Sequence, residues 1–270
     1  MARRLTSLEV QRTERLTPHM IRVVAGGDDL VEFPDTPYTD RYVKLVFPRP
    51  GVDYPEPLDM DAVRRDLPRE QWPVTRTYTV RDFDPAAREL TIDFVHHGDS
   101  GLAGPWAAAA RPGDRLRLLG PGGAYAPRTD AGWHLLVGDE AALPAIGAAL
   151  ERIPAGVPAL AVIEVADDAE HQHLRSPGDA RITWVHRDAT SPGQLVDTVR
   201  AIEFPPGQVH AFVHGEAGAV KQLRRHLIDE RGVRREWLSI SGYWRHGRDE
   251  DGFREDKAAD RRVEEQATAS

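Results

Sequence analysis

The stretch HLLVGDEAALPAI at residues 134–146 joins a short apolar run to a helical pattern, and it decides the fold of the second half of the chain. The run HLLVG predicts a strand, and the alanine-rich residues after it predict a helix. The carboxyl end of a strand that feeds a helix is where open α/β sheets bind nucleotides. The stretch has neither a G-x-G-x-x-G nor a P-loop lysine, so a standard dinucleotide fingerprint is absent.

Four more apolar runs predict strands after this one, at residues 159–166, 181–185, 209–214 and 237–241. Helical patterns lie between most of them, at 141–153, 193–202 and 219–232. In the last helix, Leu223 and Leu227 repeat at helical spacing, and Gly232 is a suitable stop. Strands and helices that alternate in this way predict a parallel sheet with helices on its faces. Residues 214–218 repeat the strand-to-helix transition and are candidates for the far wall of a nicotinamide pocket.

The first half of the chain has a different character, with β-rich runs separated by turn residues. Strands are predicted at 41–47, 76–83, 89–97 and 115–123, and a short alanine-rich helix precedes Pro112 and Gly113. Several strands at short intervals with one small helix predict a closed antiparallel barrel. Residues 48–73 are too proline-rich for regular structure, and they predict a long loop with a functional role.

The change of pattern near residues 127–133 predicts two domains, at 1–128 and 129–246. A charged tail at 247–270 follows, and it is expected to be helical or disordered. A length of 270 residues is ample for two domains that each bury a core.

Composition excludes several classes of protein. The 35 basic and 43 acidic residues give a net charge of −8, which disfavours nucleic acid and anionic membranes as partners. The chain has no cysteine, which excludes disulfides, a thiol nucleophile, cysteine-ligated zinc and iron–sulfur clusters. Because no secretory signal or long apolar segment is visible, we expect a cytoplasmic protein, and a monomer is the default.

The first candidate site is RTYTVR at residues 76–81. Side chains alternate on a strand, so the even-numbered residues share one face and the odd-numbered residues share the other. A tyrosine ring can lie against an isoalloxazine, a threonine hydroxyl can reach a flavin nitrogen, and an arginine can grip a pyrophosphate. The alternative is an ordinary strand with aromatic packing and solvent-facing arginines.

Two further segments are candidates. In HHGDSGLAGPW at 96–106, three glycines leave backbone N–H groups accessible, Ser100 can donate to a phosphate, and a small helix opens. The alternative is a flexible loop that caps this helix. The adjacent histidines point to opposite faces of a strand and lack a carboxylate at ligand spacing, so no metal site is predicted. In SGYWRHGR at 241–248, adjacent aromatic residues beside cations suggest a site, or else a plug that closes the second domain.

Together these segments resemble the siderophore-interacting protein family of flavin-dependent ferric-siderophore reductases, which are related to ferredoxin–NADP reductases. RTYTVR is similar to that family's flavin-binding strand, and DFVHHG followed by GPW is similar to its flavin-pyrophosphate segment. GDEAALPAI resembles its GDETALPAI turn, and SGYWRHGR matches its C-terminal signature. The resemblance runs from about Arg12 to Lys257, with the motifs in the family's order. Ala141 replaces a common threonine, and Gly122 stands where an arginine is frequent.

The resemblance implies a six-stranded FAD-binding barrel followed by an α/β domain of the NAD(P)-binding type. It implies cofactor contacts from residues of both domains: Arg76, Thr77, Tyr78, Thr79, His97, Gly98, Ser100, Asp139, Glu140, Ala142, Ala145, Tyr243 and Trp244. An anionic chelate on an acidic protein needs a local basic pocket, for which the candidates are Lys44, Arg81, His97, Arg245, Arg248 and Lys257. Electron transfer needs no acid or base, so none is assigned.

The implied activity is reduction of a ferric siderophore and release of Fe(II), with FAD as cofactor and NADH, NADPH or reduced ferredoxin as electron donor. One alternative is a flavin NAD(P)H oxidoreductase whose acceptor is a quinone or a redox protein. Another alternative is a non-catalytic protein that binds a ferric chelate or a flavin.

Overall fold

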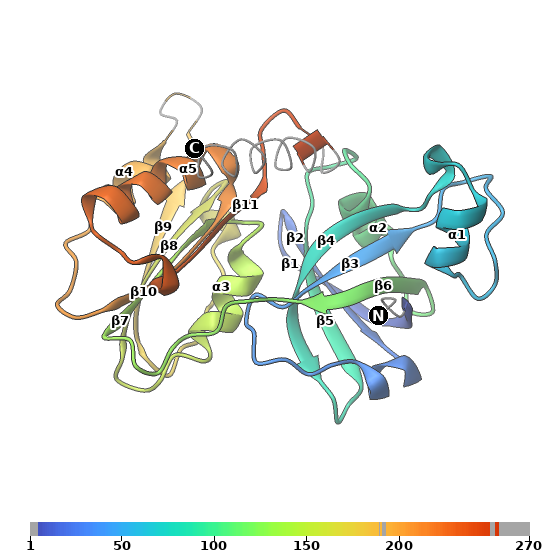
Figure 1. Cartoon of the computed structure of the whole chain (residues 1–270), viewed down its shortest axis with the longest axis horizontal. Coiled ribbons are helices and arrows are strands. Elements are labelled where there is room, and N and C mark those ends of the chain that lie inside the picture. The colour runs from blue at the N-terminus through green and yellow to red at the C-terminus, as the bar shows by residue number, and fades with distance from the viewer. Residues whose placement is uncertain (1–4, 189, 191–192, 249–251, 254–270) are drawn as a thin grey trace, which may run out of the picture.

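The computed structural model describes residues 5–188, 190, 193–248 and 252–253, which form a β-barrel and a parallel sheet side by side (Figure 1). The barrel strands are β1 (Leu5–Thr17), β2 (Met20–Gly26), β3 (Tyr42–Phe47), β4 (Val74–Asp84), β5 (Glu89–Val95) and β6 (Arg115–Gly122). Their order is β1-β2-β5-β4-β3-β6, the barrel is closed, and each neighbouring pair is antiparallel. The predicted six-stranded antiparallel barrel is confirmed.

The barrel core comes from the alternation of each strand between two faces. In β1, the burial of Leu8 and Val10 alternates with exposed residues, and both contribute to the same cluster as Leu45, Ile92 and other inward-facing side chains. The second half of β1 is mostly exposed, which explains why no apolar pattern revealed this strand in the sequence. The short helix α2 (Ala103–Ala109) lies where the alanine-rich segment predicted it and packs Ala103 and Ala107 on the same core.

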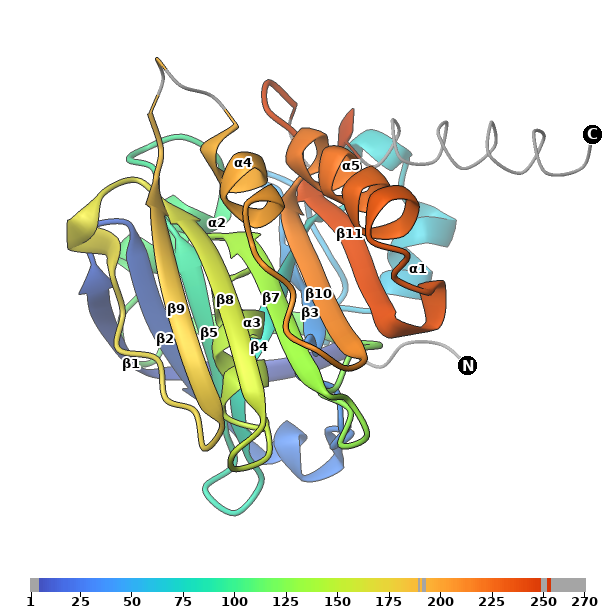
Figure 2. The same ribbon diagram turned by 90° about the vertical axis from the view of Figure 1, so that its left-hand side faces the viewer.

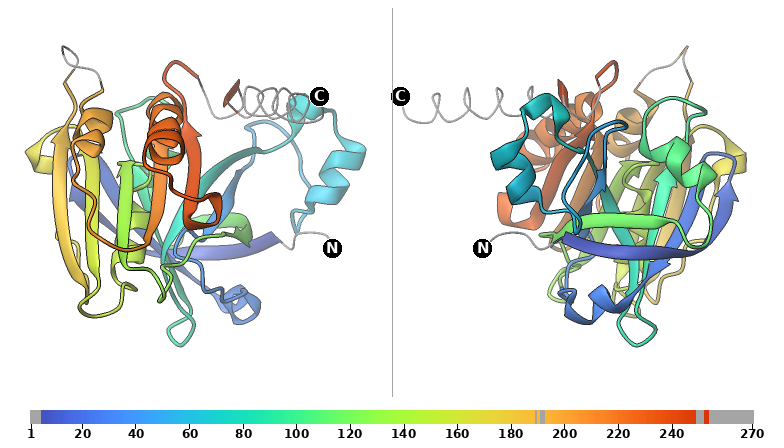
Figure 3. Two further views of the ribbon diagram at one scale, coloured as in Figure 1. Left: turned by 60° about the vertical axis from the view of Figure 1, so that its left-hand side comes forward. Right: turned by 90° about the vertical axis from the view of Figure 1, so that its right-hand side faces the viewer.

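The prediction of an irregular loop over residues 48–73 is wrong. This segment contains the helix α1 (Met60–Asp66) and the 3₁₀ turn η2 (Arg69–Gln71). An Asp59 side-chain oxygen caps α1 by accepting hydrogen bonds from two backbone amides of its first turn, at 2.8 and 3.2 Å. Met60 and Val63 pack with Leu58 in a small cluster that also contains Val46 of β3 and Leu119 of β6. Helix α1 lies at the end of the barrel away from the sheet (Figures 1 and 3).

The second half forms a five-stranded sheet with the order β11-β10-β7-β8-β9, in which every neighbouring pair is parallel. Its strands are β7 (Trp133–Asp139), β8 (Pro158–Val165), β9 (Asp179–His186), β10 (Val209–Glu216) and β11 (Leu238–Trp244). Each matches a predicted strand. The predicted parallel sheet is therefore confirmed.

Three helices cover this sheet: α3 (Leu143–Leu150), α4 (Gln194–Arg200) and α5 (Ala217–Arg225), the last continuing as a π-helical turn, η4 (His226–Glu230). Helices α4 and α5 cover one face, and α3 covers the face that looks toward the barrel (Figure 2). Three 3₁₀ turns complete the described structure: η1 (Asp28–Glu32), η3 (Asp168–Glu170) and η5 (Arg235–Trp237). Across the described ranges, no helix has both the length and the apolar character of a membrane span.

The barrel and the sheet meet along α3, which packs against β4. The connection from β6 to β7 runs through residues 123–132, which include the boundary expected between residues 128 and 129. We propose the two units as the two domains. Most of the charged tail, including residues 254–270, lies outside the described residues.

Candidate functional site

The carboxyl end of β7 carries Asp139, which joins the ends of three parallel strands. Its Oδ2 accepts hydrogen bonds from the backbone N–H of Glu216 at 2.8 Å, at the end of β10, and from Trp244 Nε1 at 2.7 Å, at the end of β11. Its Oδ1 accepts from the Ala141 N–H at 2.9 Å. Gly215 has a φ of 140°, and a Cβ there would lie 2.6 Å from Oδ2, so the carboxylate needs a glycine at this point.

Asp139 is only 1% exposed, and burial is the main cause that raises its pKa to about 6. The negative charge of Glu140 raises the pKa of Asp139 further, whereas the hydrogen bonds from Trp244, Ala141 and Glu216 lower it. The sequence motif placed Asp139 and Trp244 in one site, and the structure brings them into direct contact. We infer that Asp139 holds the Trp244 indole against the sheet edge.

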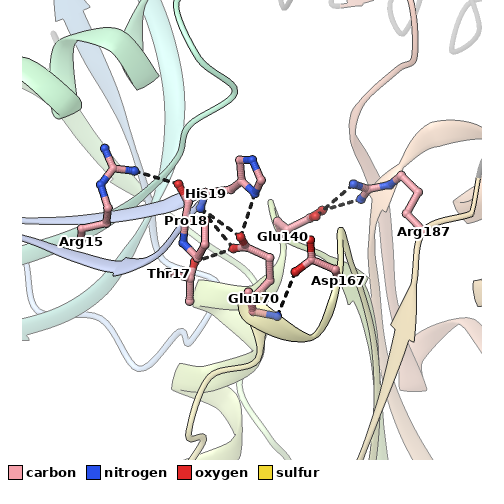
Figure 4. Close-up of polar contacts among 9 residues, drawn as sticks. Arg15, Thr17, Pro18, His19, Glu140, Asp167, Glu170 and Arg187 are labelled. Atoms are coloured by element: carbon pink, nitrogen blue, oxygen red, sulfur yellow. Dashed lines mark hydrogen bonds and ion pairs between the residues drawn. The ribbon is translucent and has the colours of Figure 1, made fainter.

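Glu140 is almost fully buried and forms a bidentate ion pair with Arg187, at 3.0 Å for Nη1 and 2.5 Å for Nη2 (Figure 4). Arg187 Nε also donates to Glu164 at 3.4 Å. Arg187 is not among the site residues predicted from the sequence. It follows β9 directly and so lies at the carboxyl edge of the sheet. That position alone was a signal, because ligands bind at this edge of open sheets.

Ala142 and Ala145 belong to the core. Their side chains are 0% and 1% exposed and pack with Leu136 and Ile146. A Cβ on Gly138 would lie 2.5 Å from the Ala142 Cβ, so small residues allow α3 to approach the end of β7 closely. The contact between these two residues and a nucleotide, which the resemblance implied, stays a prediction.

On the barrel, β4 presents the RTYTVR segment. The Tyr78 ring lies 4.5 Å from that of Phe94 between centroids, tilted by 34°, so one side of the ring rests on the barrel core. Thr79 is buried, whereas Thr77 is exposed and lies opposite Lys44 of β3. Residues directly opposite on neighbouring strands share a face, so Lys44 stands beside Thr77. Arg76 is half-buried, and its Nη1 donates to the Thr75 carbonyl at 2.9 Å.

The loop after β5 is open to a ligand. Gly98 and Gly101 have φ values of 64° and 83°, and no atom of the described residues lies within 4 Å of a Cβ built on either. Ser100 Oγ donates to the His97 carbonyl at 3.0 Å. Burial is the main cause that lowers the pKa of His97, with Glu140 acting in the opposite direction and Arg187 in the same one. The barrel loop therefore lies within electrostatic reach of the sheet edge.

The end of β11 brings the sheet toward the barrel. The pKa of the Tyr243 hydroxyl is raised by burial first, and then by nearby Asp40, Asp139 and Tyr42. Tyr42 belongs to β3 and lies opposite Thr79 of β4. Tyr243 therefore approaches the part of the RTYTVR segment that contains Thr79. The Arg245 guanidinium lies 5.9 Å from the centre of the Phe253 ring, and the exposed Arg248 donates its backbone N–H to the Arg245 carbonyl. Lys257 lies outside the described residues.

Arg81 does not join this group. Its guanidinium donates to both carboxylate oxygens of Glu151, at 3.1 and 2.6 Å, just after the end of α3. Both residues line a separate polar cleft of about 660 Å³ that also contains Arg12 and Arg22. The Arg81 guanidinium is engaged by Glu151 across the junction between barrel and sheet, and its predicted role in receiving substrate stays a prediction.

The residues of the barrel face fit a flavin dinucleotide. The fit rests on a guanidinium, hydroxyl groups and an aromatic ring on one strand, and on a loop whose Gly98 and Gly101 leave the backbone uncovered. These are the groups that bind a pyrophosphate and cover an aromatic ring system.

In comparisons with known proteins, both halves of the chain match models of siderophore-interacting proteins. Residues 9–125 match the model of the siderophore-interacting FAD-binding domain, and residues 131–247 match that of the siderophore-interacting protein. The ferric vibriobactin reductase ViuB of Vibrio cholerae is 32% identical over 93% of both chains. The NADPH-dependent ferric-chelate reductase of Escherichia coli is 32% identical over 84% of this chain and 88% of its own.

A crystal structure of a siderophore utilization protein from T. fusca is 42% identical, covers 91% of this chain and 94% of its own, and superposes with a TM-score of 0.78. The matched family is the one that the sequence motifs resemble, so that prediction is confirmed.

Proposed function

This chain belongs to the siderophore-interacting protein family, and from this premise we propose that it is an FAD-dependent reductase that takes ferric siderophores as substrate and releases Fe(II). The observation that carries the proposal is the meeting of two segments at the junction. The loop at 97–101 lies close enough to the sheet edge for the charges of Glu140 and Arg187 to act on the pKa of His97. At the end of β11, Tyr243 lies near Tyr42, which is opposite Thr79 of β4.

FAD, when bound, accepts two electrons as a hydride and passes them on singly. Two ferric ions are thus reduced for each nicotinamide oxidised. Iron(III) is a harder acid than iron(II), so catecholate or hydroxamate oxygens hold it far more tightly, and reduction opens the chelate. No side chain needs to move a proton to the iron.

We assign the chain's own residues to binding and orientation. Arg76 and the open backbone at Gly98 hold the phosphates of FAD, and the exposed side of Tyr78 covers the ring. Thr77 and Thr79 supply hydroxyl groups along the same strand. Asp139 fixes Trp244, so that this indole and the neighbouring Tyr243 form the wall on the side of the sheet.

For the electron donor, we propose a nicotinamide nucleotide bound at the carboxyl edge of the sheet, which is where open α/β sheets bind nucleotides. The relative from Escherichia coli is named as NADPH-dependent, which supports this choice. Reduced ferredoxin is the alternative donor. The cytoplasmic location and the monomeric state expected from the sequence stay predictions.

The test is to load the purified protein with FAD and follow its yellow colour without oxygen. We expect NADH or NADPH to bleach it and a ferric siderophore to restore it. A protein that bleaches but is re-oxidised only by a quinone supports the oxidoreductase with a different acceptor. A protein that binds a ferric chelate without turnover supports the non-catalytic alternative. A colourless protein that takes up no FAD contradicts the proposal.

Arg245 tests the basic pocket, because it is the predicted substrate-binding residue that directly follows Trp244 at the end of β11. We expect Arg245→Ala to raise the KM for an anionic ferric chelate about tenfold, which corresponds to about 1.4 kcal/mol. The KM for a neutral chelate should change less than about twofold, since it loses no charge pairing. Steady-state kinetics with the two chelates measure this difference. Equal effects on both would rule out the pocket.

A further inference from the structure

Glu170 lies in the junction between barrel and sheet. It follows β8 of the sheet, and its side chain contacts Thr17 and His19 of the barrel (Figure 4). Its side chain is 3% exposed. Glu170 Oε2 accepts from the Thr17 hydroxyl at 2.5 Å, and Oε1 accepts from the His19 backbone N–H at 3.1 Å. His19 Nδ1 lies 2.7 Å from the same Oε1. One carboxylate of the sheet domain thus engages three groups of the β1–β2 hairpin.

Glu170 is fixed to the carboxyl edge of the sheet. It ends the turn η3, which follows β8 closely and is capped by Asp167, whose Oδ1 accepts from the Ala169 N–H at 2.9 Å. Figure 4 shows Glu170 on the side of the Glu140–Arg187 pair, facing the hairpin.

His19 is in turn hydrogen-bonded to the residue that precedes the 97–101 loop, which we assign to the flavin phosphates. The His19 carbonyl accepts from the His96 N–H at 2.9 Å, and His97 is the next residue. Arg15 braces the same hairpin turn by donating to the Pro18 carbonyl at 2.8 Å. Hydrogen bonds therefore run without a break from the sheet edge through Glu170 and His19 to the start of the 97–101 loop.

We propose that Glu170 is a positioning residue, which fixes the 97–101 loop against the carboxyl edge of the sheet and so sets how closely the electron donor approaches the flavin. This inference rests on the proposed function. Transfer between two bound groups depends steeply on their separation, and a misplacement of about 1 Å can cost about a hundredfold in rate. Substrate iron meets the flavin from outside the junction, so its reduction should depend less on Glu170.

A second contact across the junction provides the matched control. Glu151 pairs with Arg81 and is 40% exposed. Helix α3 runs back from the carboxyl edge of the sheet, so Glu151, just after its end, lies at the opposite end of the junction. Loss of Glu151 removes a charge pair between the same two units without touching the chain of bonds through His19.

The experiment compares Glu170→Ala, Glu170→Gln and Glu151→Gln with the unmodified protein. Hydrogen–deuterium exchange of the FAD-free protein reports the amides of Thr17, His19 and Met20 and of residues 95–101. Anaerobic stopped flow then measures reduction by NADH, NADPH and reduced ferredoxin, and separately re-oxidation by a ferric siderophore. Titration with FAD gives its Kd.

For Glu170→Ala, we expect at least tenfold faster exchange in both segments and 10- to 100-fold slower reduction by the donor. Re-oxidation by the ferric siderophore and the Kd for FAD should stay within about threefold. Glutamine keeps an acceptor for the His19 N–H, so Glu170→Gln should recover reduction to within about fivefold. Glu151→Gln should stay within about twofold in every measurement.

The proposal is overturned if reduction by the donor is unchanged in Glu170→Ala, or if both half-reactions and FAD affinity fall together. If Glu170→Ala does not fold, Glu170→Asp takes its place, because its shorter side chain cannot keep the contacts with both Thr17 and His19. The same results then support or overturn the proposal. If no donor reduces the unmodified protein, the proposed function fails. Hydrogen exchange then tests Glu170 by itself, and unchanged exchange at residues 95–101 contradicts the proposal.

Discussion

Asp139→Ala is expected to lower the free energy of unfolding by about 3–5 kcal/mol, because it leaves three part-buried donors without an acceptor. These are the N–H groups of Ala141 and Glu216 and the indole N–H of Trp244. Each unsatisfied buried group costs about 1–3 kcal/mol, and the three costs are not additive. Denaturant unfolding measures the change, and Trp244 should also become more mobile in time-resolved fluorescence.

Asp139→Asn is the matched control. Its amide has the same shape, and its oxygen can still accept the two bonds now made to Oδ2, while its NH₂ group faces the Ala141 N–H. We expect it to lose about half as much stability as Asp139→Ala. A loss below about 1 kcal/mol for Asp139→Ala would show that Asp139 does not hold the strand ends together.

His134→Leu is expected to stabilise the protein by about 1–3 kcal/mol at pH 7, because neither buried ring nitrogen of His134 has a hydrogen-bond partner among the described residues. Burial also lowers the pKa of His134 from 6.5 to about 4. The unfolded chain therefore binds a proton at His134 near pH 6.5, whereas the folded protein does so only near pH 4. Stability is retained above pH 6.5 and is lost as the pH falls through this window.

The gain from His134→Leu should consequently grow by about 2 kcal/mol between pH 7 and pH 5. His210, whose pKa burial also lowers to about 4, remains in the variant and keeps part of the acid sensitivity. Urea unfolding at both pH values measures the difference. Turnover at pH 7 should be unchanged, because His134 lies near the start of β7, at the opposite edge of the sheet from the candidate site. A gain that does not depend on pH contradicts a buried neutral histidine.

Local patterns predicted much of the fold because each reflects a contact close in sequence. The strand β7 and the helix α3 follow from an apolar run that turns into an alanine-rich helix. The same reasoning fails for α1, because the prolines of residues 48–73 predict breaks throughout a segment that contains a helix. Pro57 and Pro68 flank α1 and do not interrupt it, and Asp59 caps its start.

The candidate site was predictable only where a motif carried it. Asp139 and Trp244 lie in recognisable segments, and the structure adds that they are bonded to each other. Ala142 and Ala145 share a motif with Asp139 but serve packing, which a motif does not distinguish from binding. Glu170 had no local signal, because its partners Thr17 and His19 lie more than 150 positions away in the chain.

In the proposed reaction, the electrons of the donor reduce Fe(III) of the siderophore, and the iron is released as Fe(II). The most direct measurement mixes the FAD-loaded protein, NADH or NADPH, and a ferric siderophore without oxygen, in the presence of a colorimetric Fe(II) trap. Two Fe(II) should appear for each nicotinamide oxidised, or one for each reduced ferredoxin if that is the donor. Omitting FAD should stop both changes. Oxidation of the donor without trapped Fe(II) would contradict the account.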